Sequence, residues 1–285
     1  MSLPENAESL KVSPAETLSI LFIGDVFGKS GRRALGQHLG RLKGAHPLDM
    51  VIANGENSAG GIGITPSVAT ELFHLGIDVI TTGNHIWKYK EIFGYLDNNN
   101  RLLRPMNYPS GVPGHGSVLF TTLSGLRVAV LNLSGRVFMD PLDCPFQTAD
   151  RFLDRVQMGR DVDAIIVDMH AEASSEKGAM GHHLDGRVSA VLGTHTHIPT
   201  ADHRILPKGT AFQTDVGMTG CYHSIIGMRA ETVMPRFLKQ MPTHFEQVSE
   251  EGTVCGAVVT LLKESGLCRA IQPVRLGAQL ANTGL

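Results

Sequence analysis

The sequence predicts an α/β protein, and three observations lead to that class. Short apolar runs of strand length recur along the chain, and they end in glycine-rich turns. Over residues 18–98, segments with helical spacing follow these turns, so that strand and helix alternate three times. Polar side chains stand where each of these runs ends, and α/β proteins place functional groups at the carboxyl ends of their strands.

The first part of the chain contains three predicted strand–helix units. The strands are expected at residues 18–24, 48–53 and 77–82, and the helices at 32–43, 65–75 and a polar segment that ends near 98. Glycines within 28–31 are expected to make the turn after the first strand. Thr65 is suited to cap the second helix, and Pro66 is suited to its first position.

The second part of the chain is richer in proline and in predicted strands. Strands are expected at residues 116–121, 126–131, 163–168, 188–192, 211–214, 253–262 and 267–273, and a helix at 231–240. The first two of these strands are expected to be antiparallel, and the last two to pair as a hairpin across Gly266. Because there is no repeat or interdomain linker, we predict one domain over residues 18–285 after a flexible extension over 1–17.

Composition and charge exclude several classes of protein. Of the 285 residues, 42% are hydrophobic and 18% charged, which is ordinary for a globular enzyme. A net charge of -2 gives the whole chain no attraction to nucleic acid or to an anionic membrane, so we expect neither as a stable partner. No apolar stretch approaches the roughly 20 residues of a membrane span. The four cysteines are scattered, which favours reduced thiols and a cytoplasmic location.

Polar side chains at the strand ends form a candidate metal site. Two histidines follow the 188–192 run, and in extended backbone residues two apart point to the same side. The candidates along the whole chain are Asp25, Glu56, Asn57, Asn84, His85, His170, His195 and His197. Carboxylate, amide and imidazole ligands together favour iron, manganese or zinc. The set is too large for one ion with an open position, and it suits two ions about 4 Å apart that share a carboxylate.

The order of these motifs resembles the calcineurin-like metallophosphoesterases. The blocks read GDVFG at 24–28, GEN at 55–57, GNHIW at 83–87, a single histidine at 170 and GTHTH at 193–197. Phe27 stands where that superfamily usually has a histidine, Glu56 stands for the bridging aspartate, and GNHIW lacks the usual glutamate. These departures resemble a narrower branch, the YmdB-like phosphodiesterases, from about residue 18 to beyond 245. Further matches are LLRPMNYP at 102–109, TDVGMTG at 214–220 and the segment 236–246.

The resemblance implies a four-layer α/β/β/α sandwich with two central mixed sheets. It also implies a first ion held by Asp25, Glu56, Asn57 and His197, and a second held by Glu56, Asn84, His170 and His195. Asn57 would take the coordination place of the histidine that Phe27 replaces, and His85 would stand beside the substrate phosphate as a catalytic residue. The implied ions are iron or manganese first, with zinc as a further option.

The resemblance further implies a phosphodiesterase that hydrolyses cyclic nucleotides, with 2',3'-cyclic nucleoside monophosphates as the main class. Attack by a hydroxide that bridges the two ions would open the phosphate ring. Two alternatives stay open: a broader phosphomonoesterase or nucleotidase, and a metal-binding regulatory protein with incidental hydrolysis. Some single residues also have structural roles as alternatives to metal binding: a helix cap for Asp25, turns for Asn57 and Asn84, and a core position for His170. A homo-oligomer is left open.

Overall fold

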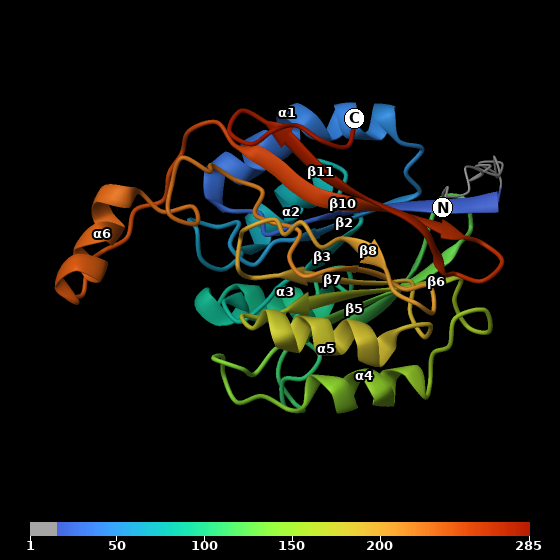
Figure 1. Cartoon of the computed structure of the whole chain (residues 1–285). Coiled ribbons are helices and arrows are strands. Elements are labelled where there is room, and N and C mark those ends of the chain that lie inside the picture. The colour runs from blue at the N-terminus through green and yellow to red at the C-terminus, as the bar shows by residue number, and fades with distance from the viewer. Residues whose placement is uncertain (1–15) are drawn as a thin grey trace, which may run out of the picture.

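The computed structural model describes residues 16–285, and its centre is a pair of facing β-sheets (Figure 1). The five-stranded sheet has the order β11–β10–β1–β2–β3. Its strands are β1 (Thr17–Ile23), β2 (Met50–Asn54), β3 (Val79–Thr81), β10 (Thr253–Leu262) and β11 (Cys268–Gly277). The six-stranded sheet has the order β4–β5–β6–β7–β9–β8. Its strands are β4 (Ser117–Thr121), β5 (Arg127–Ser134), β6 (Ala164–His170), β7 (Ala190–Thr194), β8 (Arg204–Ile205) and β9 (Ala211–Gln213).

Helices cover the outer faces of both sheets. The helices of the described residues are α1 (Gly28–Ala45), α2 (Pro66–His74), α3 (Ile92–Asn98), α4 (Pro145–Leu153), α5 (Ser174–Leu184) and α6 (Ala230–Lys239), with a short 3-10 turn, η2 (Ile86–Lys88). Helices α1 and α2 lie over the five-stranded sheet, whereas α4 and α5 lie over the six-stranded sheet (Figure 1). The result is the predicted four-layer α/β/β/α sandwich.

Alternation of side chains along the strands builds the hydrophobic layers. In β1, Ile20 and Phe22 point into the core between the sheets. Leu21 and Ile23 point the other way, into the core beneath α1 and α2. Strands β5 and β6 divide their residues in the same manner between the central core and the core beneath α4 and α5. Because successive residues of a strand face opposite sides, one continuous apolar run supplies two cores.

Both sheets are mixed, as the resemblance implied. In the five-stranded sheet β1, β2 and β3 are parallel, while β10 is antiparallel to both β1 and β11. In the six-stranded sheet β5, β6, β7 and β9 are parallel, and β4 and β8 form antiparallel edges. The parallel strands of both sheets end on the same side of the molecule, and this edge carries the candidate site.

Several predicted element boundaries need correction. Helix α1 begins at Gly28 and not at residue 32, because the amide of Gly31 donates to the carbonyl of Phe27 and closes a first turn there. The predicted cap of α2 is confirmed, since Thr65 accepts a hydrogen bond from the amide of Val68. The predicted extension lies outside the described residues except for Glu16 and Thr17, and Thr17 already belongs to β1.

Helices α4 and α5 were not predicted. In α5 the buried face includes Glu176 and Lys177 beside Met180 and Leu184, so the sequence shows no apolar stripe at helical spacing. Helix α4 does carry a signal, with a proline at its start and apolar residues at helical spacing. None of the described helices has the length and apolar character needed to cross a membrane.

Candidate metal centre and catalytic site

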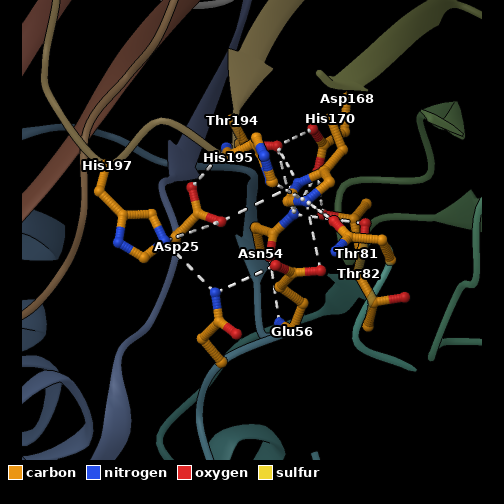
Figure 2. Close-up of polar contacts among 12 residues, drawn as sticks. Asp25, Asn54, Glu56, Thr81, Thr82, Asp168, His170, Thr194, His195 and His197 are labelled. Carbon is orange, nitrogen blue, oxygen red and sulfur yellow. Dashed lines mark hydrogen bonds and ion pairs between the residues drawn. The ribbon is translucent and has the colours of Figure 1, made fainter. Parts of the chain in front are cut away.

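The eight predicted site residues lie together where strands of both sheets end. Figure 2 labels Asp25, Glu56, His170, His195 and His197 among them. In the five-stranded sheet, the site residues lie in the turns directly after β1, β2 and β3. In the six-stranded sheet, the site histidines lie at the end of β6 and directly after β7. The residues from the first sheet are Asp25, Glu56, Asn57, Asn84 and His85, and those from the second are His170, His195 and His197. The cluster therefore joins the two halves of the sandwich.

Four potential ligand atoms converge on one point of the cluster. Nε2 of His170 lies 3.2 Å from Oε2 of Glu56 and 3.2 Å from Oδ1 of Asn84. It also lies 3.1 Å from Nδ1 of His195. The ligand atoms of Glu56, His170 and His195 all lie within 4.8 Å of one another, so this group could hold a metal ion. It is the group that was predicted, with Asn84, for the second ion.

Hydrogen bonds fix which nitrogen of each imidazole faces that point. The hydroxyl of Thr194 donates to Oδ1 of Asp168 at 2.7 Å, and it therefore accepts from Nδ1 of His170 at 2.8 Å. Nε2 of His195 lies 3.1 Å from a carboxylate oxygen of Glu172, to which it donates. The remaining nitrogens of His170 and His195 then face each other with lone pairs, and a cation between them satisfies both.

Burial and charge act in opposite directions on the ionisation of these groups. Burial lowers the pKa of His170, but the charges of Glu56 and Asp25 outweigh it and raise that pKa to about 9. Burial, together with the charge of His170, lowers the pKa of His195 to about 3. Burial opposes ionisation of Glu56, yet His170 and His85 hold its pKa well below the usual range. The cluster thus favours a positive charge at its centre, either a proton or a metal ion.

A second group of ligand atoms surrounds the other side of Glu56. Oδ2 of Asp25 accepts from the amide of His195 at 3.0 Å. Oδ1 of Asp25 is buried without a hydrogen-bond partner, and it lies 3.8 Å from Nε2 of His197. His197 donates from Nδ1 to the carbonyl of Ile226 at 3.0 Å, so its Nε2 carries a lone pair. A buried carboxylate oxygen without a donor is costly, and a cation beside it and His197 relieves that cost.

Glu56 lies between the two groups of ligand atoms. Its Oε2 faces His170, whereas its Oε1 accepts from Nδ2 of Asn57 at 3.0 Å. The same Nδ2 of Asn57 lies 3.3 Å from Nε2 of His197. The position of Glu56, with one oxygen toward each group, is the position that a carboxylate shared by two ions would occupy.

His85 lies at the edge of the cluster and is the most exposed of its histidines, with 36% of its side chain accessible. Its Nδ1 is held at 2.9 Å by Oδ1 of Asn57 and at 3.1 Å by Oε1 of Glu56. His85 lines the cavity, and its Nε2 has no hydrogen-bond partner among the described residues. A histidine held in this way at the wall of a cavity can donate a proton to a bound molecule.

The loop that carries His195 and His197 differs from its prediction. Strand β7 ends at Thr194, and the two histidines have positive φ values of 98° and 68°, so the backbone there is not extended. The two side chains consequently reach different parts of the cluster (Figure 2). Asp25 holds the amide of His195, and Asp215 accepts from the amide and hydroxyl of Thr196 at 3.1 and 2.7 Å. These contacts hold the unusual backbone in place.

Several supporting residues were not predicted. Asp168 accepts hydrogen bonds from Asn54, Thr81 and Thr194, and thereby orients His170 through Thr194. Asp215 lies within the TDVGMTG segment and pairs with the buried Lys177 at 2.8 Å. The available signal was that Asp168 ends an apolar run and that Asp215 directly follows the strand predicted at 211–214.

Phe27 fills the place where a histidine is usual. Its side chain is buried, and its ring meets the ring of His197 edge to face with 5.6 Å between centroids. Gly61 and Gly227 lie against the ring, and a Cβ on Gly61 would come within 2.9 Å of it. Phe27 therefore supports His197 by packing and offers no ligand atom.

One cavity of about 1120 Å³ opens over the cluster. Its lining includes Glu56, Asn57, His85, His195 and His197 on one side, and residues of α6 and of the segment 244–247 on the other. The volume is slightly above the range of roughly 300–1,000 Å³ that is usual for small-molecule sites. Titratable residues, convergent ligand atoms and a cavity together form a typical catalytic site.

Comparison with known proteins agrees with this geometry. A 2',3'-cyclic-nucleotide 2'-phosphodiesterase of Bacillus subtilis is 46% identical over 244 residues, which cover 86% of this chain and 91% of that protein. A crystal structure of a phosphatase from Mycoplasma pneumoniae superposes with a TM-score of 0.85 at 33% identity, covering 92% of this chain and 94% of the other. A protein of Thermus thermophilus superposes with a TM-score of 0.83 at 44% identity, covering 92% and 100%.

The fold, the cluster and these relatives define a phosphoric ester hydrolase of the metallophosphoesterase type. Within that class the family is also clear. The sequence model of the YmdB-like proteins matches residues 21–274, and the chain belongs to that family. The predicted family and fold are thereby confirmed.

Proposed function

We propose that the protein is a dinuclear-metal phosphodiesterase that hydrolyses 2',3'-cyclic nucleoside monophosphates. The observation that carries the proposal is the position of Glu56 between two groups of lone-pair atoms, one around His170 and one around Asp25 and His197. The substrate class is supported by the name of the Bacillus subtilis relative at 46% identity.

The proposed ligand sets follow the two groups. The first ion is held by Asp25, Glu56, Asn57 and His197, and the second by Glu56, Asn84, His170 and His195. For Asn57 the amide nitrogen, and not the oxygen, faces Glu56 and His197. Ligation through Oδ1 of Asn57 therefore requires a rotation of its amide by about 180°, which would also release His85. Iron or manganese suits this donor set, and zinc is a further option.

Two bound cations would supply a hydroxide near neutral pH and offset the charge on phosphorus during attack. The protein's own groups complete the reaction. As hydroxide oxygen bonds to phosphorus, the bond from phosphorus to the ribose 2'-oxygen breaks, and that oxygen takes a proton from Nε2 of His85. The product is a nucleoside 3'-monophosphate. Oε1 of Glu56 holds the opposite nitrogen of His85 and so directs Nε2 toward the leaving oxygen.

The test combines metal analysis with an activity assay. Purified protein is analysed by elemental mass spectrometry and assayed with adenosine 2',3'-cyclic monophosphate, followed by separation of the 2'- and 3'-monophosphates. We expect close to two metal ions per chain and formation of the 3'-monophosphate. Absence of bound metal after reconstitution with iron or manganese would show that the cluster is not a metal centre.

A phosphomonoesterase is the second candidate, because the Mycoplasma pneumoniae relative of similar structure is described as a phosphatase. Release of inorganic phosphate from nucleoside monophosphates at rates above those for the cyclic substrate would favour it. We further propose that residues 18–285 act as one domain in the cytoplasm, where the four free cysteines would stay reduced.

A further inference from the structure

The cavity over the cluster has a second wall that the proposed chemistry does not use. One face of α6 contributes Val233, Arg236 and Phe237, which follow the spacing i, i+3, i+4. The segment 244–247 contributes Phe245 beside them. Because the same cavity contains His85 and Glu56, this wall is open to the rest of a substrate whose phosphate lies at the cluster.

The wall presents aromatic rings that the rest of the chain leaves uncovered. Phe237 is 71% exposed and Phe245 is 38% exposed. Helix α6 projects from the body of the molecule, and Val233 is its buried residue (Figure 1). Exposed aromatic rings in a cavity can stack against flat, unsaturated rings of a ligand. Nucleobases stack on phenylalanine in this way whichever hydrogen-bonding groups they carry.

Charge on the cavity wall matches a phosphorylated ligand. Within residues 16–285, the side chains of Arg236 and Lys88 make no hydrogen bond or ion pair, and both line the cavity. Each acidic side chain of the lining lies against a basic side chain: Glu56 against His170 at 3.2 Å, Glu172 against His195 at 3.1 Å and Glu246 against Arg229 at 3.8 Å. Two unpaired cations beside two exposed rings fit a molecule that combines a phosphate with an aromatic base.

We infer that Phe237 and Phe245 form the nucleobase subsite of this cavity and determine the preference for nucleotides over smaller cyclic phosphates. The inference rests on the proposed function. Because this wall and the cluster line the same cavity, we assign the wall to the substrate. The other exposed apolar residues of α6 and of the segment directly after it, Met234, Leu238 and Met241, do not line the cavity and have no part in the subsite.

The test compares a substrate with and without a base. We would measure kcat/KM for adenosine 2',3'-cyclic monophosphate and for methyl ribofuranoside 2',3'-cyclic phosphate, using the metal-loaded enzyme. In Phe237→Ala and Phe245→Ala, the ratio of the two values should fall about 10-fold, mainly through KM for the nucleotide, because stacking on one ring is lost. Phe138→Ala is the matched control, since Phe138 is 90% exposed and lies outside the cavity lining.

The possible outcomes are distinct. A ratio that stays at the wild-type value in both variants, or falls equally in Phe138→Ala, would overturn the subsite. A drop in molecular mass by sedimentation velocity in Phe237→Ala would assign the wall to a second copy of the chain and likewise overturn it. If wild-type enzyme hydrolyses neither substrate, the proposed function fails and not merely the subsite.

Discussion

At the scale of single residues, the three histidines among the ligand candidates are oriented by partners outside the cluster. Asp168 fixes His170 through Thr194, and the carbonyl of Ile226 fixes His197. Such partners preset the tautomer of an imidazole, so the lone pair faces the intended ion. Glu56 differs from the others because both of its oxygens are used, one on each side of the cluster.

Replacing Glu56 is therefore expected to have the largest effect. Glu56→Gln removes the one carboxylate shared by both proposed ions, and it should abolish most metal binding and hydrolysis. Metal content by elemental mass spectrometry and turnover of adenosine 2',3'-cyclic monophosphate are the two measurements. Glu71→Gln, at an exposed ion pair with Arg32, is the control and should behave as wild type. Wild-type activity in Glu56→Gln would contradict the proposed site.

His85 is expected to act on the substrate and not on the ions. His85→Ala should retain both ions but lose roughly 100- to 10,000-fold in kcat, which is the usual contribution of a general acid. The same two measurements separate the roles. If His85→Ala loses metal along with activity, His85 is a ligand and the proton donor must be sought elsewhere.

At the scale of elements, short turns after the strands bring the ligands into contact. The turn after β3 contains Gly83, and a Cβ at that position would overlap Nε2 of His170 and Oε2 of Glu56. The turn after β7 is held by Asp215, which pairs with Lys177 of α5. In both places, side chains from other elements constrain the conformation of the turn.

Gly83→Ala tests the closeness of the turn after β3. The added methyl group should displace His170 or Glu56, so we expect loss of metal and of activity. Gly94→Ala is the matched control, because Gly94 lies in α3 with open space around it. That change should preserve activity and raise the free energy of unfolding by about 0.5–1 kcal/mol, as alanine favours helix over glycine. Full metal content in Gly83→Ala would show that the cluster has room that the structure does not indicate.

Lys177→Met tests the buried ion pair behind the 195–197 loop. Lys177 and Asp215 are 1% and 0% exposed, so removal of one partner leaves a buried charge and should cost roughly 3–5 kcal/mol of unfolding free energy. Urea unfolding measures this cost. Arg187→Met breaks the exposed pair with Asp150 and should cost about 1 kcal/mol or less. Equal costs for the two variants would mean that burial does not control the strength of the Lys177 pair.

At the scale of the whole molecule, the cluster connects the two sheets. Asp25 and Glu56 follow strands of the five-stranded sheet, while His170 ends β6 in the six-stranded sheet. The proposed ions would take ligands from both sheets and so cross-link the layers, and they would bind the folded chain better than the unfolded one. Metal binding should therefore contribute to the stability of the entire sandwich.

Removal of metal is expected to lower the unfolding temperature. At an ion concentration roughly 100-fold above its Kd, binding contributes about 3 kcal/mol. Chelation should then lower Tm by roughly 5–10 °C, and added Mn²⁺ should restore it. Differential scanning calorimetry measures the shift, and Glu56→Gln serves as the control that should not respond to the chelator. An equal shift in that variant would place the effect outside the cluster.

The sequence by itself determined the α/β class, most strands and the eight residues of the cluster. These follow from local patterns, since an apolar run, a glycine turn and a polar residue lie next to one another along the chain. The order of the motifs also determined the family. Helix α5 escaped prediction because its buried face contains Glu176 and Lys177, whose partners are distant in sequence.

Only the tertiary structure decided how the cluster is arranged. His195 and His197 do not share one side of an extended strand, because Asp25 and Asp215 hold their loop with positive φ values. The roles of Asp168 and Asp215, and the aromatic wall on α6, likewise depend on contacts between segments far apart in the chain. Such contacts leave no periodic signal, because they are set by how the two sheets and their loops pack and not by neighbouring residues.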